Sequence, residues 1–436
     1  MTTITQQHQS PGIATLPPHA EDAAAQRLVD TRCQLCGGSR AATVLDLGPA
    51  PLLVSIGDAD PHDDDRAHHL RLVRCVACGT VQLDDTLDTG ARHRIATAAA
   101  DRSLAGRPDL ARRFCEEAID RWNLRGDGQI IEIGSGTGSL LRFFRAWQLP
   151  VLGIEPDDSL TRYARLRRIP TWRASFDAAI AGRVARAGLH ADLLIISTPT
   201  GGFDDLREML AASTTVLRPG GVMTLELPDV LRLLEHSRID DCCHANRVMP
   251  SITQLRTAVS AFGLELIDVA PSEVSSGRLR VWLRRTRAGV TQVEHTRLRA
   301  RLRAETAAAI ADPRTIAAFT RRMTLVVEQI ASLIRDARAQ HHTVAAYGTG
   351  RSAVALASAA SLHRPDVAYV IDDDPIAPGT MLPGTDIPVI STEQAGAWRA
   401  DLLLALDDLP GTLAGWDSVP VYAVTDLIDV VHRLTS

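Results

Sequence analysis

Lysine is missing from this sequence of 436 residues, so all 47 basic side chains are arginine. This absence excludes every mechanism that needs a lysine Schiff base or a lysine general base. Aromatic residues are also scarce, at 4%. The formal net charge is −5 and the pI is near 6.3, which gives no reason to expect nucleic acid or an anionic membrane as a partner.

Long apolar runs are absent as well. No run approaches the roughly 20 residues that a membrane-spanning helix needs. The first residues have neither the basic n-region nor the apolar core of a secretory signal. We therefore expect a cytoplasmic protein, in which closely spaced cysteines indicate a metal site rather than disulfides.

The order of apolar runs predicts an α/β protein of several domains. Residues 1–30 are rich in Gln, Pro, Ala and Thr and are expected to form a flexible arm. Short strand-like runs at 31–85 predict a small β-rich module. At 86–290, a helical linker precedes alternating strands and helices, which are typical of a mostly parallel, doubly wound sheet with an antiparallel edge. A helical connector at 291–340 leads to a second, smaller Rossmann-like domain at 341–436.

Four of the seven cysteines form two CxxC pairs, Cys33/Cys36 and Cys75/Cys78. Four thiolates at this spacing suit a tetrahedral zinc ion, which would hold together a module too small to be stable by apolar burial alone. Because four thiolates leave no open coordination position, we expect a structural zinc. A redox pair or free thiols remain the alternative.

A glycine-rich loop follows the predicted strand QIIEIG and precedes a helix. Glycines at this turn allow the backbone to approach a ligand closely. An acid before the loop and an acid ending the next strand favour S-adenosylmethionine (SAM), with the second acid on its ribose. Nicotinamide enzymes use a similar arrangement, so a two-Rossmann oxidoreductase stays open as an alternative. The candidate cofactor residues are Glu132, Gly134, Ser135, Gly136, Gly138, Glu155 and, after the fourth strand, Thr198.

The segments CxxC…CxxC, EIGSGTGS, LRPGGVMTLELPD, AAYGTGRSAVAL, VIDDDP and PGTDIPVI, in this order, resemble the three-domain sugar C-methyltransferases. The resemblance implies an N-terminal zinc-binding domain, a class I SAM methyltransferase domain and a C-terminal Rossmann-like domain that helps to hold a nucleotide sugar. It also implies that Arg280 contacts substrate, as do the loop residues Tyr347, Gly348, Arg351 and Ser352.

The sequence departs from this family where carbanion chemistry would be performed. The family's Tyr-x-Glu-His segment is replaced by Cys243-His244-Ala245-Asn246, and the stretches at 198–202 and 275–277 also differ. Asparagine cannot act as a general base. We take His244, Asn246 and His236 as the candidate catalytic positions, with solvated or capping histidines as the alternative.

Besides the oxidoreductase alternative, the sequence leaves two functions open. The first is a SAM-dependent methyltransferase of antibiotic or deoxysugar biosynthesis, acting on a nucleotide-sugar-like or other small acceptor. The second is a diverged SAM-binding relative that catalyses a non-methylating step or serves as a partner subunit. The chain is expected to be a monomer or a homodimer.

Overall fold

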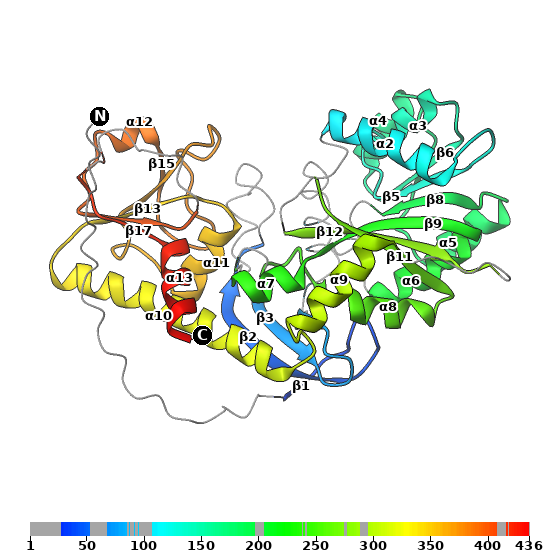
Figure 1. The fold of residues 1–436 in the computed structure, drawn as a ribbon. Helices are drawn as coiled ribbons and strands as arrows, with labels where there is room; N and C mark the ends of the chain where they lie inside the picture. Colours follow the sequence, from blue (N-terminus) through cyan, green and yellow to red (C-terminus); the bar gives the residue numbers. More distant parts are fainter. Residues whose placement is uncertain are drawn as a thin grey trace, which may run out of the picture.

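The computed structural model describes residues 28–52, 68–84, 87, 91, 95, 107–196, 205–237, 239, 242–273, 277–287, 295–407, 416 and 418–435. Three sheets organise these residues, and Figure 1 shows the long helix α10 (Pro313–Ala339) running along the C-terminal sheet toward the strands of the first sheet. Within the described part of the chain, no helix combines the length and apolarity that a membrane crossing requires.

The first sheet contains the N-terminal module and has the order β1-β2-β3-β4-β10. Its strands are β1 (Leu28–Asp30), β2 (Arg40–Ala50), β3 (His68–Cys75), β4 (Val81–Leu83) and β10 (Val248–Met249). All neighbouring pairs are antiparallel. Two features differ from the sequence expectation: β1 lies inside the predicted arm, and β10 comes from the following domain.

The second sheet has seven strands in the order β11-β12-β9-β8-β5-β6-β7. Five strands are parallel to their neighbours, and the edge pair is antiparallel, as the sequence predicts. The central parallel strands β5, β6 and β8 are short, almost fully buried and mostly apolar, as expected for a sheet covered on both faces. Their bounds are β5 (Ile130–Ile133), β6 (Val151–Glu155), β7 (Thr171–Arg173), β8 (Ala191–Ile196) and β9 (Leu217–Pro228), with β11 (Leu264–Pro271) and β12 (Arg278–Arg285) at the edge.

Helices cover both faces of this sheet (Figure 1). One face packs against α2 (Pro108–Trp122), α3 (Leu141–Ala146) and α4 (Asp158–Leu166). The other packs against α5 (Ala178–Arg186), α6 (Leu206–Val216), α8 (Ile252–Ser260) and α9 (Thr296–Ala307). Aspartates cap several of these helices and also α7 (Val230–His236), whose cap Asp229 accepts a hydrogen bond from the Arg232 amide.

The third sheet is parallel, with the order β15-β14-β13-β16-β17. It comprises β13 (Val344–Tyr347), β14 (Tyr369–Asp372), β15 (Val389–Ser391), β16 (Leu402–Ala405) and β17 (Val421–Ala423). Its helices are α11 (Arg351–Ala359), α12 (Thr392–Ala395) and α13 (Val424–Thr435). The predicted second Rossmann-like domain is therefore present.

The long helix α10 (Pro313–Ala339) joins this domain to the rest of the protein. Asp312 and Pro313 start the helix, and buried apolar residues recur every three or four positions along it. This stripe belongs to one continuous core that also contains side chains of β2, α7 and α11. The zinc module and the C-terminal domain are thus packed together, with α10 as a shared wall rather than a simple connector.

Candidate functional site

The four predicted metal ligands lie together. Their sulfur atoms are all within 4.8 Å of one another. Sγ of Cys33 is 3.6 Å from Sγ of Cys78, and Sγ of Cys36 is 3.6 Å from Sγ of Cys75. Zinc–sulfur bonds of about 2.3 Å in a tetrahedron place the sulfurs about 3.8 Å apart, so the quartet fits a zinc ion.

Backbone amides and neighbouring side chains contact the sulfur atoms of the quartet. The Cys36 amide points to Cys33 Sγ at 3.5 Å, and the Gly38 amide points to Cys36 Sγ at 3.4 Å. A hydrogen bond from Cys33, aided by Thr80, lowers the pKa of Cys78 to about 4. The same pairing, together with burial, raises the pKa of Cys33. A bound zinc ion would hold all four sulfurs as thiolates, so its binding would release their protons.

The glycine loop that follows β5 has the geometry expected of a ligand cradle. Gly134, Gly136 and Gly138 have φ values of +69°, +53° and +72°, a region that favours glycine. A Cβ added to Gly136 would meet nothing within 4 Å, whereas one added to Gly138 would lie 3.0 Å from Ile169. Gly136 therefore borders open space, and Gly138 is packed against the protein.

Glu155, at the end of β6, is buried and faces this loop. Its Oε2 accepts a hydrogen bond of 2.8 Å from the Gly136 amide, and its Oε1 accepts one of 2.9 Å from the Asp157 amide. The carboxylate thus fixes the loop and lies where a ribose could be bound. The chemistry of this acid and the open face at Gly136 fit SAM.

The other candidate cofactor residues divide into three cases. Glu132 is fully buried within β5. Ser135 is also buried, and its hydroxyl lies so close to β6 that a Cβ on Gly153 would be 2.4 Å from it. Thr198 lies outside the described residues, as does the altered stretch around it.

The candidate substrate residue Arg280 lies beside a second polar cluster at the carboxyl end of β9. Arg280 donates to the Glu226 carboxylate at 2.8 Å, and its guanidinium lies 4.8 Å from the ring centre of Phe114. On the same strand, Arg278 donates to Asn246 Oδ1 at 2.8 Å. Asn246 is thus a buried acceptor fixed by an arginine, consistent with its inability to act as a base.

The two candidate histidines occupy different environments. His244 is buried, at 4% exposure, whereas His236 is exposed in the last turn of α7. The ring of His244 meets the ring of His68 edge to face, with 6.0 Å between centroids. His68 begins β3 of the zinc module, far from His244 in the sequence, so the contact joins two domains. Sequence reasoning missed His68 because no local pattern distinguishes it.

The predicted substrate loop of the C-terminal domain is lined by carboxylates. The Thr349 amide donates to Asp372 at 2.8 Å, the Gly350 amide to Asp407 at 2.7 Å, and the Tyr347 hydroxyl to Asp373 at 2.8 Å. Burial and this hydrogen bond raise the pKa of Tyr347. A Cβ on Gly348 would lie 2.5 Å from Asp407, so the close approach requires glycine.

These carboxylates change what the loop can bind. An anionic group would need to displace Asp407 from the start of α11 or bind through the half-buried Arg351 and Ser352. The run of acids after β14 was visible in the sequence. The approach of Asp407 was not, because it follows a different strand.

Family models match the chain in three consecutive segments. Residues 33–91 match "Putative zinc binding domain", residues 105–269 match "Methyltransferase domain", and residues 273–407 match "C-methyltransferase C-terminal domain". This order of a zinc-binding, a methyltransferase and a C-methyltransferase C-terminal domain confirms the resemblance to the three-domain C-methyltransferases. By its domain matches and its fold, the chain is a SAM-dependent methyltransferase with a zinc-binding domain.

A relative at the sequence level is the C-methyltransferase NovU of Streptomyces niveus. It is 27% identical over 378 residues, which cover 86% of this chain and 89% of NovU. Two solved structures are similar over a smaller part. The amino pentose methyltransferase CalS10 of Micromonospora echinaspora has 16% identity and a TM-score of 0.29, covering 40% of this chain and 92% of CalS10. The CcbJ methyltransferase of Streptomyces caelestis has 12% identity and a TM-score of 0.31, covering 41% and 90%.

Proposed function

We propose that this protein transfers the methyl group of SAM to a small-molecule acceptor in natural-product biosynthesis, and that it does so in the cytoplasm. The acceptor class implied by the family is a nucleotide-linked deoxysugar. The observation that carries the proposal is the glycine loop, whose open face at Gly136 is bordered by the buried carboxylate of Glu155. The relationship to the C-methyltransferase NovU supports the same reaction class.

When bound, SAM supplies an electrophilic methyl group on a sulfonium. The residues of this chain then have three tasks: to hold the donor, to orient the acceptor and to receive its proton. We assign the first task to Gly134–Gly138 and Glu155. We assign the second to the arginines of β12, Arg278 and Arg280, which lie at the carboxyl end of β9.

We assign proton removal to His244. Its segment follows α7, and Asn246, two positions later, is bonded to Arg278 beside β9. When SAM supplies the methyl group, the imidazole of His244 would receive the proton that the acceptor loses. The edge-to-face contact with His68 orients the imidazole.

The test uses SAM with an isotopically labelled methyl group and a panel of nucleotide-linked keto-deoxysugars. We expect labelled product from the wild-type protein and at least a roughly hundredfold loss of turnover in His244→Asn. His236→Asn is the matched control, since it removes an exposed imidazole from the neighbouring helix. Equal activity of His244→Asn and wild type would refute the assignment of the base.

A second function is favoured because the arginines that we assign to acceptor binding already bind other side chains of the protein. Arg280 is engaged by Glu226, and Asn246 replaces a residue of the family's Tyr-x-Glu-His segment. Such a site suits a relative that binds SAM or its product without transferring methyl. Release of S-adenosylhomocysteine during turnover would refute this second function, because that product forms only when the methyl group leaves.

A further inference from the structure

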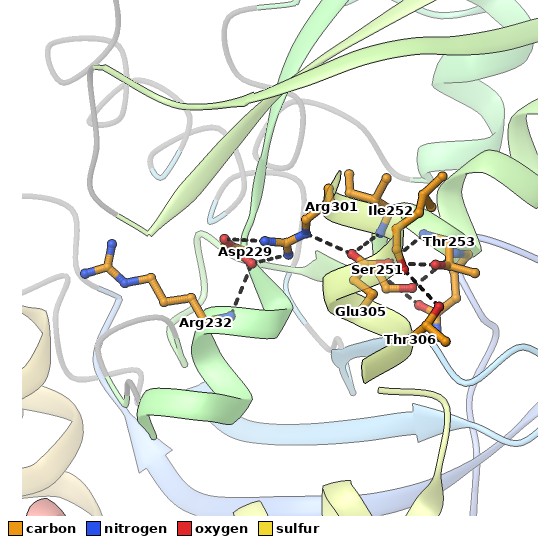
Figure 2. A network of polar contacts seen from close by, with 10 residues as sticks. Asp229, Arg232, Ser251, Ile252, Thr253, Arg301, Glu305 and Thr306 are labelled. Carbon is orange, nitrogen blue, oxygen red and sulfur yellow. Dashed lines mark hydrogen bonds and ion pairs between the residues drawn. The ribbon is translucent and has the colours of Figure 1, made fainter. Parts of the chain in front are cut away.

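A buried carboxylate of α9 caps the start of α8 (Figure 2). Oε1 of Glu305 accepts a hydrogen bond from the Ile252 amide at 2.8 Å. Oε2 accepts from the amide and the hydroxyl of Thr253, each at 2.8 Å. Glu305 is only 3% exposed, so it substitutes for water at the amides that a helix leaves unsatisfied. The position of α8 is thus fixed by a residue outside that helix.

The same carboxylate is linked to α7 through Arg301. Nε of Arg301 donates to Glu305 Oε1 at 3.1 Å, and NH1 donates to Asp229 Oδ2 at 3.0 Å. A second bond joins NH2 to Asp229 Oδ1, which makes the pair bidentate. Although burial opposes a charge, the bonds to Asp229 raise the pKa of Arg301. Figure 2 shows Arg301 between the two carboxylates.

Asp229 connects this network to the acceptor side of the methyltransferase domain. It immediately follows β9, and its amide donates to the Gly277 carbonyl at 2.8 Å, just before β12. Its carboxylate caps α7 through the Arg232 amide at 3.2 Å. Because α7 leads into the segment of His244 and Asn246, the start of α7 sets where that segment begins.

The opposite end of the network reaches the cysteine quartet. Ser251 and Gln254 form a capping box at the start of α8. Oε1 of Gln254 accepts a hydrogen bond of 3.3 Å from the Thr80 hydroxyl, and that hydroxyl oxygen lies 3.2 Å from Cys78 Sγ. A continuous series of polar contacts therefore runs from a metal ligand through α8 and α9 to α7.

We propose that Arg301 and Glu305 are positioning residues of the methyl-acceptor site, and that these two residues couple the cysteine quartet to helix α7. The proposal rests on the proposed function for its consequence, but its physical content is the coupling between the two places. Zinc binding orders the cysteine quartet, and the contact of Thr80 with Gln254 then holds the start of α8 in place. The bridge formed by Glu305, Arg301 and Asp229 transmits the position of α8 to α7.

The coupling is measured by amide hydrogen exchange of a peptide covering α7, in zinc-loaded full-length protein and after chelation. In the wild type, we expect chelation to speed exchange in α7 by roughly tenfold or more. In Arg301→Gln, exchange in α7 should already be fast with zinc bound and should change little on chelation. Equal α7 exchange rates in the zinc-loaded and the chelated wild-type protein would overturn the proposal.

Arg322→Gln is the matched control. Arg322 also contacts α7, through Ser237 Oγ at 3.1 Å and the Leu234 carbonyl, but it does not belong to the bridge. This variant should loosen α7 and still respond to chelation. The same loss of response in Arg322→Gln as in Arg301→Gln would refute a specific role for Arg301.

Chelation could unfold the zinc module as a whole, so a second variant interrupts the series of contacts without removing zinc. Thr80→Val removes the hydroxyl between Cys78 and Gln254 while zinc stays bound. We expect faster exchange in α7 but an unchanged S-adenosylhomocysteine affinity, and unchanged α7 exchange would contradict the coupling. Because these readouts need no acceptor, failure of the proposed methyl transfer would be recognised separately, as absence of labelled product.

Discussion

Substitution of Gly136 by alanine tests the cofactor site, because its effect on cofactor affinity can be measured separately from its effect on folding stability. The residue has φ of +53°, and a Cβ there would meet no atom within 4 Å. The methyl group therefore causes no clash within the protein itself. Its cost to folding is the left-handed backbone alone, about 1–2 kcal/mol.

The same methyl group would project into the space where we place the cofactor. Crowding by one methyl group in a close-fitting site costs about 2 kcal/mol, which corresponds to a roughly thirtyfold weaker affinity. Titration calorimetry with S-adenosylhomocysteine on zinc-loaded protein measures this change. Denaturant unfolding of the same sample gives the accompanying loss of stability.

Two further glycines provide matched controls. Gly188 has φ of +72° and also has open space at its Cβ position, but it lies in the turn after α5. Gly188→Ala should show the same backbone cost and normal affinity. Gly138→Ala should destabilise the domain further, because its Cβ would lie 3.0 Å from Ile169. Wild-type affinity in Gly136→Ala, or an equal loss in Gly188→Ala, would refute the cofactor assignment.

Three other substitutions test the fold and the metal centre. Cys75→Ser should lower the zinc content, measured by atomic absorption, and unfold the first sheet, because three thiolates bind zinc far less tightly than four; full retention of zinc would contradict this. Asp268 is fully buried, which by itself would raise its pKa, but hydrogen bonds from Arg297 and Arg121 lower the pKa below 3.8. The stability that the charged carboxylate gives the fold is therefore present above that pH and is lost on acidification. Asp268→Asn should cost about 3–5 kcal/mol at neutral pH and flatten the acid side of the stability curve measured by urea unfolding, whereas an unchanged curve would refute this. Gly153→Ala should disturb the cofactor loop through Ser135 and weaken S-adenosylhomocysteine binding, and normal calorimetric affinity would show that the loop tolerates the shift.

The sequence by itself determined the features that arise from neighbouring residues. The alternation of buried runs such as Ile130–Ile133 with amphipathic helices specifies a parallel sheet, because period and length are local properties. The two CxxC pairs specify a metal centre, since thiolate chemistry and spacing are encoded in the residues themselves. The glycines at 134, 136 and 138 likewise predict a tight turn after the strand, and all three have positive φ values.

The tertiary structure alone decided which distant residues meet. Nothing near His68 predicts its contact with His244, and nothing near Glu305 predicts that it caps α8. Asp407 reaches the predicted substrate loop because β16 lies beside β13, which sequence spacing cannot reveal. Sequence spacing also cannot reveal that β10, from the methyltransferase domain, pairs with β4 of the zinc module. Pairings between separate segments depend on how three domains share buried surface, so they are set by packing rather than by local pattern.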